Sequence, residues 1–405
     1  MNWEYVTLDK LGSVSRGRSK HRPRNDKALF GGKYPFVQTA DVKAAELYLT
    51  DYTETYNERG LEQSKLWKAG TLCITIAANI ADTAILGIDA CFPDSVMGFI
   101  PFEGVSNVKF VKYAFDILQR DCQKISQGTA QDNLSWKKLS TINFPAPPIE
   151  IQNKIVDILS VYDDLIENNK KQIKLLEETA QRLYKEWFVD LRFPGYEDVD
   201  IVDGVPEGWK KEPLSEVFTY VRGKSYTSKE LVENGGALMV NLKNIRAFGG
   251  YNRNAEKRYS GKYKEEQKLN PGDLVMGVTD MTQERRLVGH VAIIPDIGET
   301  MTFSMDLIKL IPLSIQKSFL YATMYFGGYS KKISSLANGV NVLHLKPEAM
   351  MNMEMLIPTK EVIDQYDVIF DTYQKKIETL QKQCDFAAEV RDRLLPKLMS
   401  GEIEV

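Results

Sequence analysis

Basic and polar side chains gather in one short segment near the N-terminus of the 405-residue sequence. Within residues 16–27, six Lys or Arg residues accompany a single carboxylate, Asp26, and serine, histidine and asparagine lie among them. Arginine, asparagine and glutamine read base edges through paired hydrogen bonds, whereas lysine and serine mostly bind phosphates. The segment suits a nucleic-acid surface, although a single charge run is most often only a solvated face.

A weaker copy of this pattern lies in the second half of the chain, where Arg222-Gly223-Lys224-Ser225 repeats Arg16-Gly17-Arg18-Ser19. Two clusters at equivalent positions favour DNA binding. The candidate DNA contacts are Arg16, Arg18, Lys20, Arg22, Arg24, Gln38, Lys43, Arg222, Lys224, Tyr226, Asn241, Lys243, Asn244 and Arg246. The loops after Gly128 and Gly339 form a second candidate surface through Gln131, Asn133, Asn341 and His344. Helix capping and turn formation explain that second group equally well.

Residues for catalysis or metal binding do not occur at suitable spacings. The three histidines stand far apart, and neither a CxxC pair, an HExxH sequence nor a GxG turn occurs. Gly223-Lys224-Ser225 resembles the end of a phosphate-binding loop, but Phe218 stands where the first glycine is needed. The four cysteines are also isolated, which favours buried reduced thiols. The sequence therefore predicts a binding protein with no metal and no cofactor, not an enzyme.

The net charge of −3 is distributed unevenly along the chain. Residues 1–148 have a net charge of +2 and residues 205–358 a net charge of +4, whereas residues 149–204 and 359–405 have −6 and −3. Two mildly basic regions thus alternate with two acidic ones. The N-terminus lacks an export signal, and Asp82 and Asp89 interrupt the most apolar stretch. We therefore expect a cytoplasmic protein that does not associate with membranes.

The chain is a duplication of a unit of about 200 residues. Trp3 matches Trp209 at an offset of 206, and Gly128 matches Gly339 at an offset of 211. Several such matches in the same order, with slowly drifting offsets, indicate two homologous halves with small insertions in loops. Each half is predicted to contain short strands and then a helix. The strands are expected at 35–37, 72–77, 107–111, 238–242, 274–278, 290–294 and 307–311, and the helices at 113–127 and 319–338.

Each half ends in a long segment with apolar residues spaced by three and four. The first stripe comprises Ile151, Ile155, Ile158, Tyr162, Leu165, Asn169, Ile173, Leu176, Ala180, Leu183 and Trp187. The second comprises Val362, Tyr366, Ile369, Tyr373, Ile377, Leu380, Cys384, Ala387, Arg391, Leu394 and Leu398. Such spacing predicts two helices that bury their stripes against each other as an antiparallel coiled coil. The polar members Asn169, Cys384 and Arg391 either fix the register or mark where the pair opens to partner helices.

The fold class predicted from these patterns is α+β. Two homologous α/β domains are separated by two long helices that pack as an antiparallel coiled coil with pseudo-twofold symmetry. The first domain is expected at 1–148 and the first helix at 149–192. A linker follows at 193–206, then the second domain at 207–358 and the second helix at 359–400.

These features together resemble a known family. The resemblance rests on the Trp-x4-Leu opening, the Arg-Gly-Arg/Lys-Ser turn, the Gly-Gly segment, the Gly128 loop, the Phe-Pro-x-Pro-Pro exit at 144–148 and the helix end at 182–188. The ordered duplication is similar to that of specificity subunits of type I restriction–modification systems, and it covers essentially the whole chain. In such subunits the two domains are target recognition domains.

The resemblance implies a function and a set of partners. Each recognition domain would read one half of a bipartite, asymmetric target in double-stranded DNA. The helices would set the half-site spacing and dock two methyltransferase subunits, which use S-adenosylmethionine to methylate adenine. Restriction and translocase subunits would use ATP and Mg²⁺. The expected docking positions are Ile155, Tyr162, Ile173, Leu183, Trp187, Tyr366, Tyr373, Leu380 and Leu394.

Two other functions stay open from the residues alone. One is a non-catalytic coiled-coil scaffold with two protein-binding heads, whose binding to DNA would be insensitive to sequence and salt. The other is an enzyme that acts on DNA by itself, which the missing motifs argue against. The base sequence of a target depends on loop geometry and DNA shape, so it cannot be read from one sequence.

Overall fold

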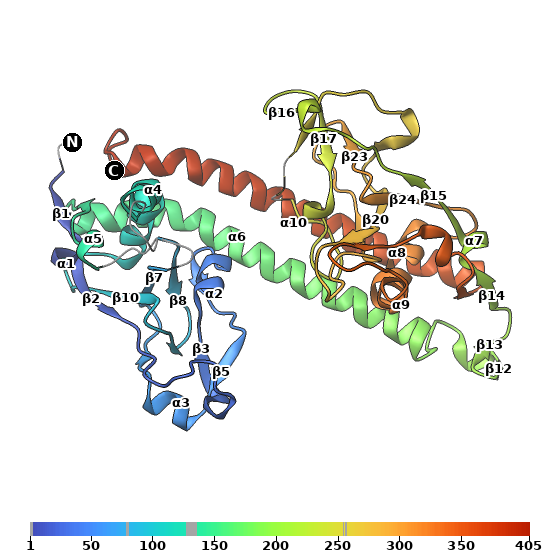
Figure 1. The fold of residues 1–405 in the computed structure, drawn as a ribbon, viewed down its shortest axis with the longest axis horizontal. Coiled ribbons are helices and arrows are strands. Elements are labelled where there is room, and N and C mark those ends of the chain that lie inside the picture. The colour runs from blue at the N-terminus through green and yellow to red at the C-terminus, as the bar shows by residue number, and fades with distance from the viewer. Residues whose placement is uncertain (1–2, 78–80, 127–135, 254, 256) are drawn as a thin grey trace. The chain divides into compact units, whose positions relative to one another are not determined.

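A computed structural model describes residues 3–77, 81–126, 136–253, 255 and 257–405 (Figure 1). The chain divides into two compact units. Unit 1 comprises Met1–Asn168 and Gln383–Val405, and unit 2 comprises Asn169–Lys382. Each unit therefore combines the described part of one half's globular region with a segment of each long helix.

Unit 1 contains a five-stranded sheet, a four-stranded sheet and a two-stranded ribbon. The five-stranded sheet has the order β2 (Gly12–Arg16), β10 (Val96–Pro101), β7 (Leu72–Thr75), β8 (Thr83–Leu86) and β4 (Tyr48–Leu49). The four-stranded sheet has the order β5 (Glu54–Tyr56), β3 (Phe30–Phe36), β9 (Ala90–Cys91) and β6 (Leu66–Trp67), and the ribbon pairs β1 (Tyr5–Thr7) with β11 (Asn143–Pro145). The helices are α1 (Leu8–Leu11), η1 (Lys27–Leu29), α2 (Thr39–Ala44), α3 (Glu58–Glu62), α4 (Val108–Ser126) and α5 (Trp136–Leu139).

Unit 2 has a similar arrangement. One sheet has the order β15 (Phe218–Arg222), β24 (Leu307–Pro312), β20 (Leu274–Gly277) and β22 (Val291–Ile293), and another has β16 (Leu231–Val232), β18 (Arg258–Tyr259), β17 (Ala237–Val240), β23 (Met301–Phe303) and β19 (Lys268–Leu269). Three ribbons pair β14 (Lys210–Pro213) with β26 (Glu354–Ile357), β21 (Thr279–Asp280) with β25 (Leu343–His344), and β12 (Ile201–Val202) with β13 (Val205–Pro206). The short helices are η3 (Tyr196–Asp198), α7 (Leu214–Val217), η4 (Ser228–Glu230), η5 (Leu242–Asn244), η6 (Glu265–Gln267), α8 (Lys317–Phe326), α9 (Tyr329–Ser334) and η7 (Pro347–Ala349).

Equivalent backbone hydrogen bonds in the two units confirm the duplication. The amide of Gly17 donates to the carbonyl of Val96 at 2.8 Å, and that of Gly223 donates to Leu307 at 3.2 Å. A Cβ atom on Gly17 or Gly223 would lie 2.3 Å or 2.0 Å from a backbone carbonyl oxygen. Glycine is therefore required in both Arg-Gly turns, because two backbone segments cross there at close range.

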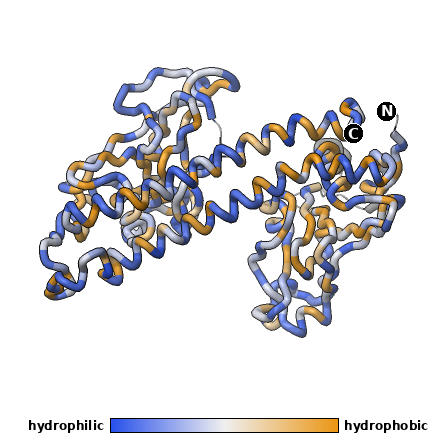
Figure 2. The backbone as a smooth tube through the Cα atoms, turned by 180° about the vertical axis from the view of Figure 1, so that it is seen from behind, coloured by the Kyte–Doolittle hydropathy of each residue, from blue (hydrophilic) through white to orange (hydrophobic). Residues whose placement is uncertain are grey.

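The two long helices are α6 (Ile149–Tyr184), which continues into the π-helical turn η2 (Lys185–Val189), and α10 (Lys360–Met399). In unit 1, Ile166 of α6 clusters with Cys384 of α10, whereas Leu159 clusters with Leu395. A lower number on one helix thus pairs with a higher number on the other, which confirms antiparallel packing. Apolar and polar segments alternate along both helices (Figure 2), as expected of amphipathic helices.

In unit 2, aromatic side chains make the contacts between the two long helices. The rings of Tyr184 and Trp187 on α6 contact Tyr366 on α10, with centroid distances of 6.4 Å and 5.9 Å. This cluster continues through Phe370 and Phe319 into the core beneath the sheet of β15, β24, β20 and β22. The helix segments and the globular part of unit 2 therefore share one core.

Three sequence-based expectations about elements are wrong. The predicted strand at 107–111 is the start of α4, where the side chain of Asn107 accepts a hydrogen bond from the amide of Lys109 at 2.9 Å. The predicted helix at 319–338 is broken at Gly327 and Gly328 into α8 and α9. Within the long helices, Ile158 and Leu165 are 37% and 41% exposed, while Leu159 and Ile166 take their places in the core.

Candidate nucleic-acid interface

The basic segment of unit 1 follows β2 and runs to η1. Its five candidate contacts are all exposed, namely Arg16, Arg18, Lys20, Arg22 and Arg24. Arg22 also supports the loop, because its guanidinium donates hydrogen bonds to the carbonyls of Ser19 and His21 at 2.7 and 2.8 Å. Arg24 forms an ion pair with Asp94 at 2.7 Å. The segment is therefore a loop of fixed shape that presents cations to solvent.

A hollow of about 620 Å³ lies beside this segment, and Arg24 and Lys27 lie on its wall. Gln38 and Glu54 also line it, and the Gln38 side-chain amide donates to the Glu54 carboxylate at 2.8 Å. The backbone amide of Gln38 donates to Asp41 at 2.7 Å, which anchors Gln38 at the start of α2. Such amides and carboxylates match base edges, and the cations match phosphates.

Two groups of candidates do not join this surface. Lys43 on α2 lines a second hollow, of about 310 Å³, together with Asp82 and Lys112. Lys43 therefore lies near carboxylates and the long helices, and it does not line the hollow beside the basic segment. Gln131 and Asn133 lie outside the described residues.

In unit 2 the equivalent segment is partly neutralised. Arg222 and Tyr220 both donate hydrogen bonds to the Glu348 carboxylate, at 2.8 Å and 2.6 Å. The hydrogen bonds from Tyr220, from its own backbone amide and from Arg222 lower the pKa of Glu348 to about 2. Lys224 is half-buried, and the hydroxyl of Tyr226 accepts a hydrogen bond from Lys257 at 3.1 Å. This copy presents less free positive charge than the copy in unit 1.

Asn241 and Asn244 are structural residues in the interior, contrary to the expectation that they read bases. Asn244 is 1% exposed, and its side-chain amide donates to the carbonyl of Ala255 at 2.8 Å. Asn241 accepts from the amide of Lys243 at 3.0 Å and caps η5. The neighbouring Lys243 and Arg246 remain exposed.

Three loops of unit 2 are joined by hydrogen bonds into one surface, which we call the loop cluster (residues 246–250, 281–287 and 338–344). The amide of Phe248 donates to the carbonyl of Arg286 at 2.7 Å. The side chain of Gln283 donates to the carbonyl of Val340 at 2.6 Å. The predicted candidates Arg246, Asn341 and His344 lie in this cluster and are exposed. The sequence-based predictions did not include Phe248, Met281, Gln283 or Arg286, because no motif in the sequence marks these loop residues.

A buried carboxylate shapes the middle loop of this cluster. Asp280 is fully buried and accepts hydrogen bonds from the amides of Thr282, Leu287 and Val288. Although burial raises the pKa of Asp280, these hydrogen bonds lower it by more. The carboxylate therefore stays charged and holds the loop in a fixed turn.

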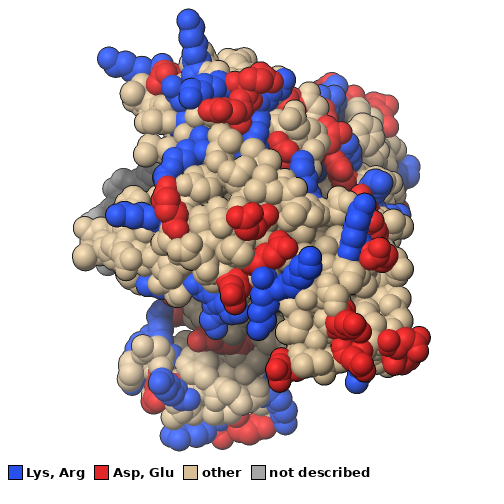
Figure 3. Space-filling model, turned by 90° about the vertical axis from the view of Figure 1, so that its right-hand side faces the viewer, with Lys and Arg blue, Asp and Glu red and all other residues tan. Residues whose placement is uncertain are grey.

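On the face drawn in Figure 3, Lys and Arg side chains alternate with Asp and Glu side chains, and no continuous basic patch covers that face. This mixture agrees with the small positive charge of each globular region. Among the residues described, none form a group of three or more His, Cys, Asp or Glu able to hold a metal ion. Within the same residues, no helix has the length and apolarity needed to cross a membrane.

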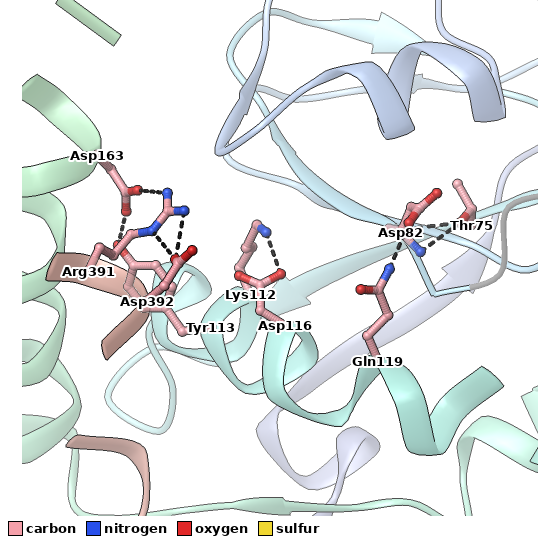
Figure 4. A network of polar contacts seen from close by, with 9 residues as sticks. All are labelled: Thr75, Asp82, Lys112, Tyr113, Asp116, Gln119, Asp163, Arg391 and Asp392. Carbon is pink, nitrogen blue, oxygen red and sulfur yellow. Dashed lines mark hydrogen bonds and ion pairs between the residues drawn. The ribbon is translucent and has the colours of Figure 1, made fainter. Parts of the chain in front are cut away.

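A polar network ties the first globular region to the long helices of unit 1 (Figure 4). Tyr113 of α4 donates a hydrogen bond to Asp163 of α6, whose side chain is 3% exposed. Arg391 of α10 pairs with Asp163 at 2.7 Å and with Asp392 at 2.9 Å. Arg391 therefore makes its ion pairs within this unit, which favours a role in fixing the register of the two helices.

A family model described as the type I restriction modification DNA specificity domain matches residues 1–178 and 206–385. The chain belongs to this family. It is 26% identical over its whole length to the specificity subunit of the type I restriction enzyme MjaIX from Methanocaldococcus jannaschii, covering 94% of that protein. It is 22% identical to the HindI specificity subunit from Haemophilus influenzae, over 67% of this chain and 71% of that protein.

A solved structure confirms the fold of this specificity-domain protein. The S subunit of a type I restriction–modification system from M. genitalium matches with a TM-score of 0.60 and 15% sequence identity. The match covers 98% of this chain and 96% of that chain. The predicted α+β class, with two homologous domains and long helices, is therefore confirmed.

The nine expected docking positions on the long helices are all at least partly buried. Five are buried (Ile155, Ile173, Trp187, Tyr366 and Leu380) and four are half-buried (Tyr162, Leu183, Tyr373 and Leu394). Within the chain these side chains therefore contribute to its own packing, and their role in docking stays a prediction. The exposed apolar side chains on these helices are instead Ile158, Val161, Leu165, Leu175, Val368 and Phe386.

Proposed function

We propose that this chain is the DNA specificity subunit of a type I restriction–modification complex. The observation that carries the proposal is the match of the specificity-domain model to both halves of the chain. The exposed cations beside a polar hollow in unit 1 and the basic loop cluster in unit 2 support it. The chain itself is non-catalytic and binds no cofactor in this proposal.

Each domain reads one half of a bipartite target. The two domains differ where they would meet DNA. In the first, Gln38 lines an open hollow, whereas its counterpart Asn241 is buried as a helix cap. A turn at 246–250 in the second domain has no counterpart in the first, where α2 continues to Ala44. The two half-sites therefore differ in sequence, and the target is asymmetric.

The long helices set the half-site spacing and dock two methyltransferase subunits in a cytoplasmic complex. The exposed face of α6 around Ile158, Val161 and Leu165 provides apolar area for docking. The methyltransferase subunits use S-adenosylmethionine to methylate adenine, and restriction and translocase subunits use ATP and Mg²⁺.

The proposal is tested by mapping adenine methylation across a genome with long reads. Cells that express this chain with its methyltransferase subunit should methylate one bipartite motif with a fixed gap. Omission of this chain alone should abolish that methylation. Methylation of the same motif without this chain would contradict the proposal.

A further inference from the structure

Phe248 of the loop cluster combines an exposed aromatic ring with a strained backbone. The residue is 56% exposed. Its φ angle is +67°, in the left-handed region that bulky residues rarely adopt. Gly249 and Gly250 follow directly and would tolerate that angle at no cost. Backbone strain of this kind clusters at functional sites, so it points to a function of the exposed ring beyond stability.

The ring is held rigidly in spite of its exposure. The Phe248 amide donates to the carbonyl of Arg286, and the amides of Gly249 and Gly250 donate to Arg246 and Val291. The ring stands edge-on against the buried His290, with centroids 5.6 Å apart. A side chain fixed in this way loses little entropy when it binds.

Two further apolar side chains project from the neighbouring loops. Met281 is 78% exposed and Val340 is 86% exposed. The hydrogen bond from Gln283 to Val340 joins their loops, and the loop of Phe248 is joined through Arg286. Apolar tips thus project from three connected loops of one domain.

The charge of the loop cluster indicates which class of partner it binds. Its three loops contain Arg246, Arg285 and Arg286 and one carboxylate, Glu284. Arg286 pairs with Glu284 at 2.5 Å and Arg246 with Glu177 of α6 at 3.5 Å, so a net positive charge is left on the loops. Arginines that flank apolar tips suit the phosphates on either side of a base step, whereas a protein-docking patch is usually depleted of charge at its centre. Double-stranded DNA is the occupant that this composition favours.

We propose that Phe248 acts as a wedge that presses between two stacked bases of the half-site read by the second domain. This inference rests on the proposed function. Inserted apolar side chains partly unstack a base step and kink the duplex, and the cost depends on the sequence deformed. The second domain would then select its half-site partly by how easily one step opens, with the arginines holding the adjacent phosphates.

In the described part of the first domain, the position equivalent to Phe248 holds no aromatic side chain. Gln38 and Asn241 occupy equivalent helix starts, and seven residues further on Ala45 takes the place of Phe248. A wedge at this position therefore belongs to the half-site of the second domain.

The test uses the assembled complex and duplexes with 2-aminopurine at successive positions of the second half-site. With the wild-type protein, fluorescence should rise at one step, because the probe brightens when it is unstacked. Phe248→Ala should abolish that rise and weaken binding by roughly tenfold to a hundredfold. A mismatch at that step, which removes the unstacking cost, should restore most of the lost affinity.

Two further variants serve as controls. Leu313→Ala removes an equally exposed apolar side chain from the same unit, and it should bind and unstack as the wild type does. Phe248→Gly relieves the backbone strain, so it should melt at no lower temperature than the wild type yet still lose the fluorescence signal.

Several outcomes overturn the inference. Unchanged fluorescence and affinity in Phe248→Ala would exclude a wedge. Loss of the methyltransferase subunit from the complex, with unchanged DNA unstacking, would make the loop cluster a protein-docking surface. A wild-type complex without preference for either half-site would contradict the proposed function itself, which distinguishes that failure from failure of the wedge alone.

Discussion

At the scale of single residues, the cations of the first domain divide into two kinds. Arg22 and Arg24 hold the loop together through the carbonyl of Ser19 and the carboxylate of Asp94. Arg16, Arg18 and Lys20 are exposed on the same segment. A charge run in a sequence does not distinguish these kinds, because the distinction depends on partners distant in the chain.

Arg18→Ala in the assembled complex should weaken binding to all DNA sequences about equally. The loss of one phosphate contact should reduce the slope of log affinity against log salt by about 1. Titrations at several salt concentrations measure this slope. Lys33→Ala removes a cation that is paired with Glu58, and it serves as the control. A slope unchanged by Arg18→Ala would place Arg18 off the DNA.

Asn244 and Gln38 should respond oppositely to substitution. Asn244→Ala removes a buried donor to the carbonyls of Asn252 and Ala255 and should lower the free energy of unfolding by about 1–3 kcal/mol. Gln38→Ala should leave stability nearly unchanged and alter the bases accepted in the first half-site. Denaturant unfolding and methylation mapping separate these effects, and a stable Asn244→Ala protein would contradict the structural role.

His290 should make the stability of unit 2 depend on pH. Burial lowers its pKa in the folded state, whereas in the unfolded chain it is about 6.5. As the pH falls below about 6.5, the unfolded chain takes up a proton on His290 that the folded protein excludes. The folded protein therefore loses stability as the pH falls from about 6.5 to the pKa of His290 in the folded state. The melting temperature should therefore fall less between pH 7 and 5 in His290→Gln than in the wild type. Equal falls in both proteins would contradict this.

At the scale of elements, the network of Asp163, Tyr113 and Arg391 determines how α4, α6 and α10 meet. Arg391→Ala leaves the buried Asp163 carboxylate without its cation and should destabilise unit 1 by about 2–4 kcal/mol. The double variant Asp163→Leu with Arg391→Met should recover most of that loss, because no charge stays buried. Urea unfolding measures both, and an additive loss in the double variant would contradict coupling.

The sequence predicted the helices well and their contacts less well. The length and spacing of α6 and α10 followed from the heptad pattern. The wrong placement of Ile158 and Leu165 arose because a straight helix turns every 3.6 residues and drifts from a 3.5-residue repeat. The strand expected at 107–111 failed because the buried Phe110 and Val111 and the half-buried Val108 lie at the start of a helix and pack into the core.

At the scale of the whole molecule, the duplication was readable from sequence, and the differences between its copies were not. The offsets of Trp3 and Gly128 from their partners revealed two domains. Asn241 and Gln38 both stand at the N-cap of a short helix, but Asn241 is buried whereas Gln38 lines a hollow. That depends on packing in each domain, which no local pattern encodes.

In the proposed function, each domain reads its own half-site. The most direct measurement is methylation mapping of a chain whose residues 1–148 are replaced by the first domain of another family member. One half of the methylated motif should change, while the other half and the gap between them stay the same. A change in both halves, or in neither, from a complex that still methylates DNA would contradict it.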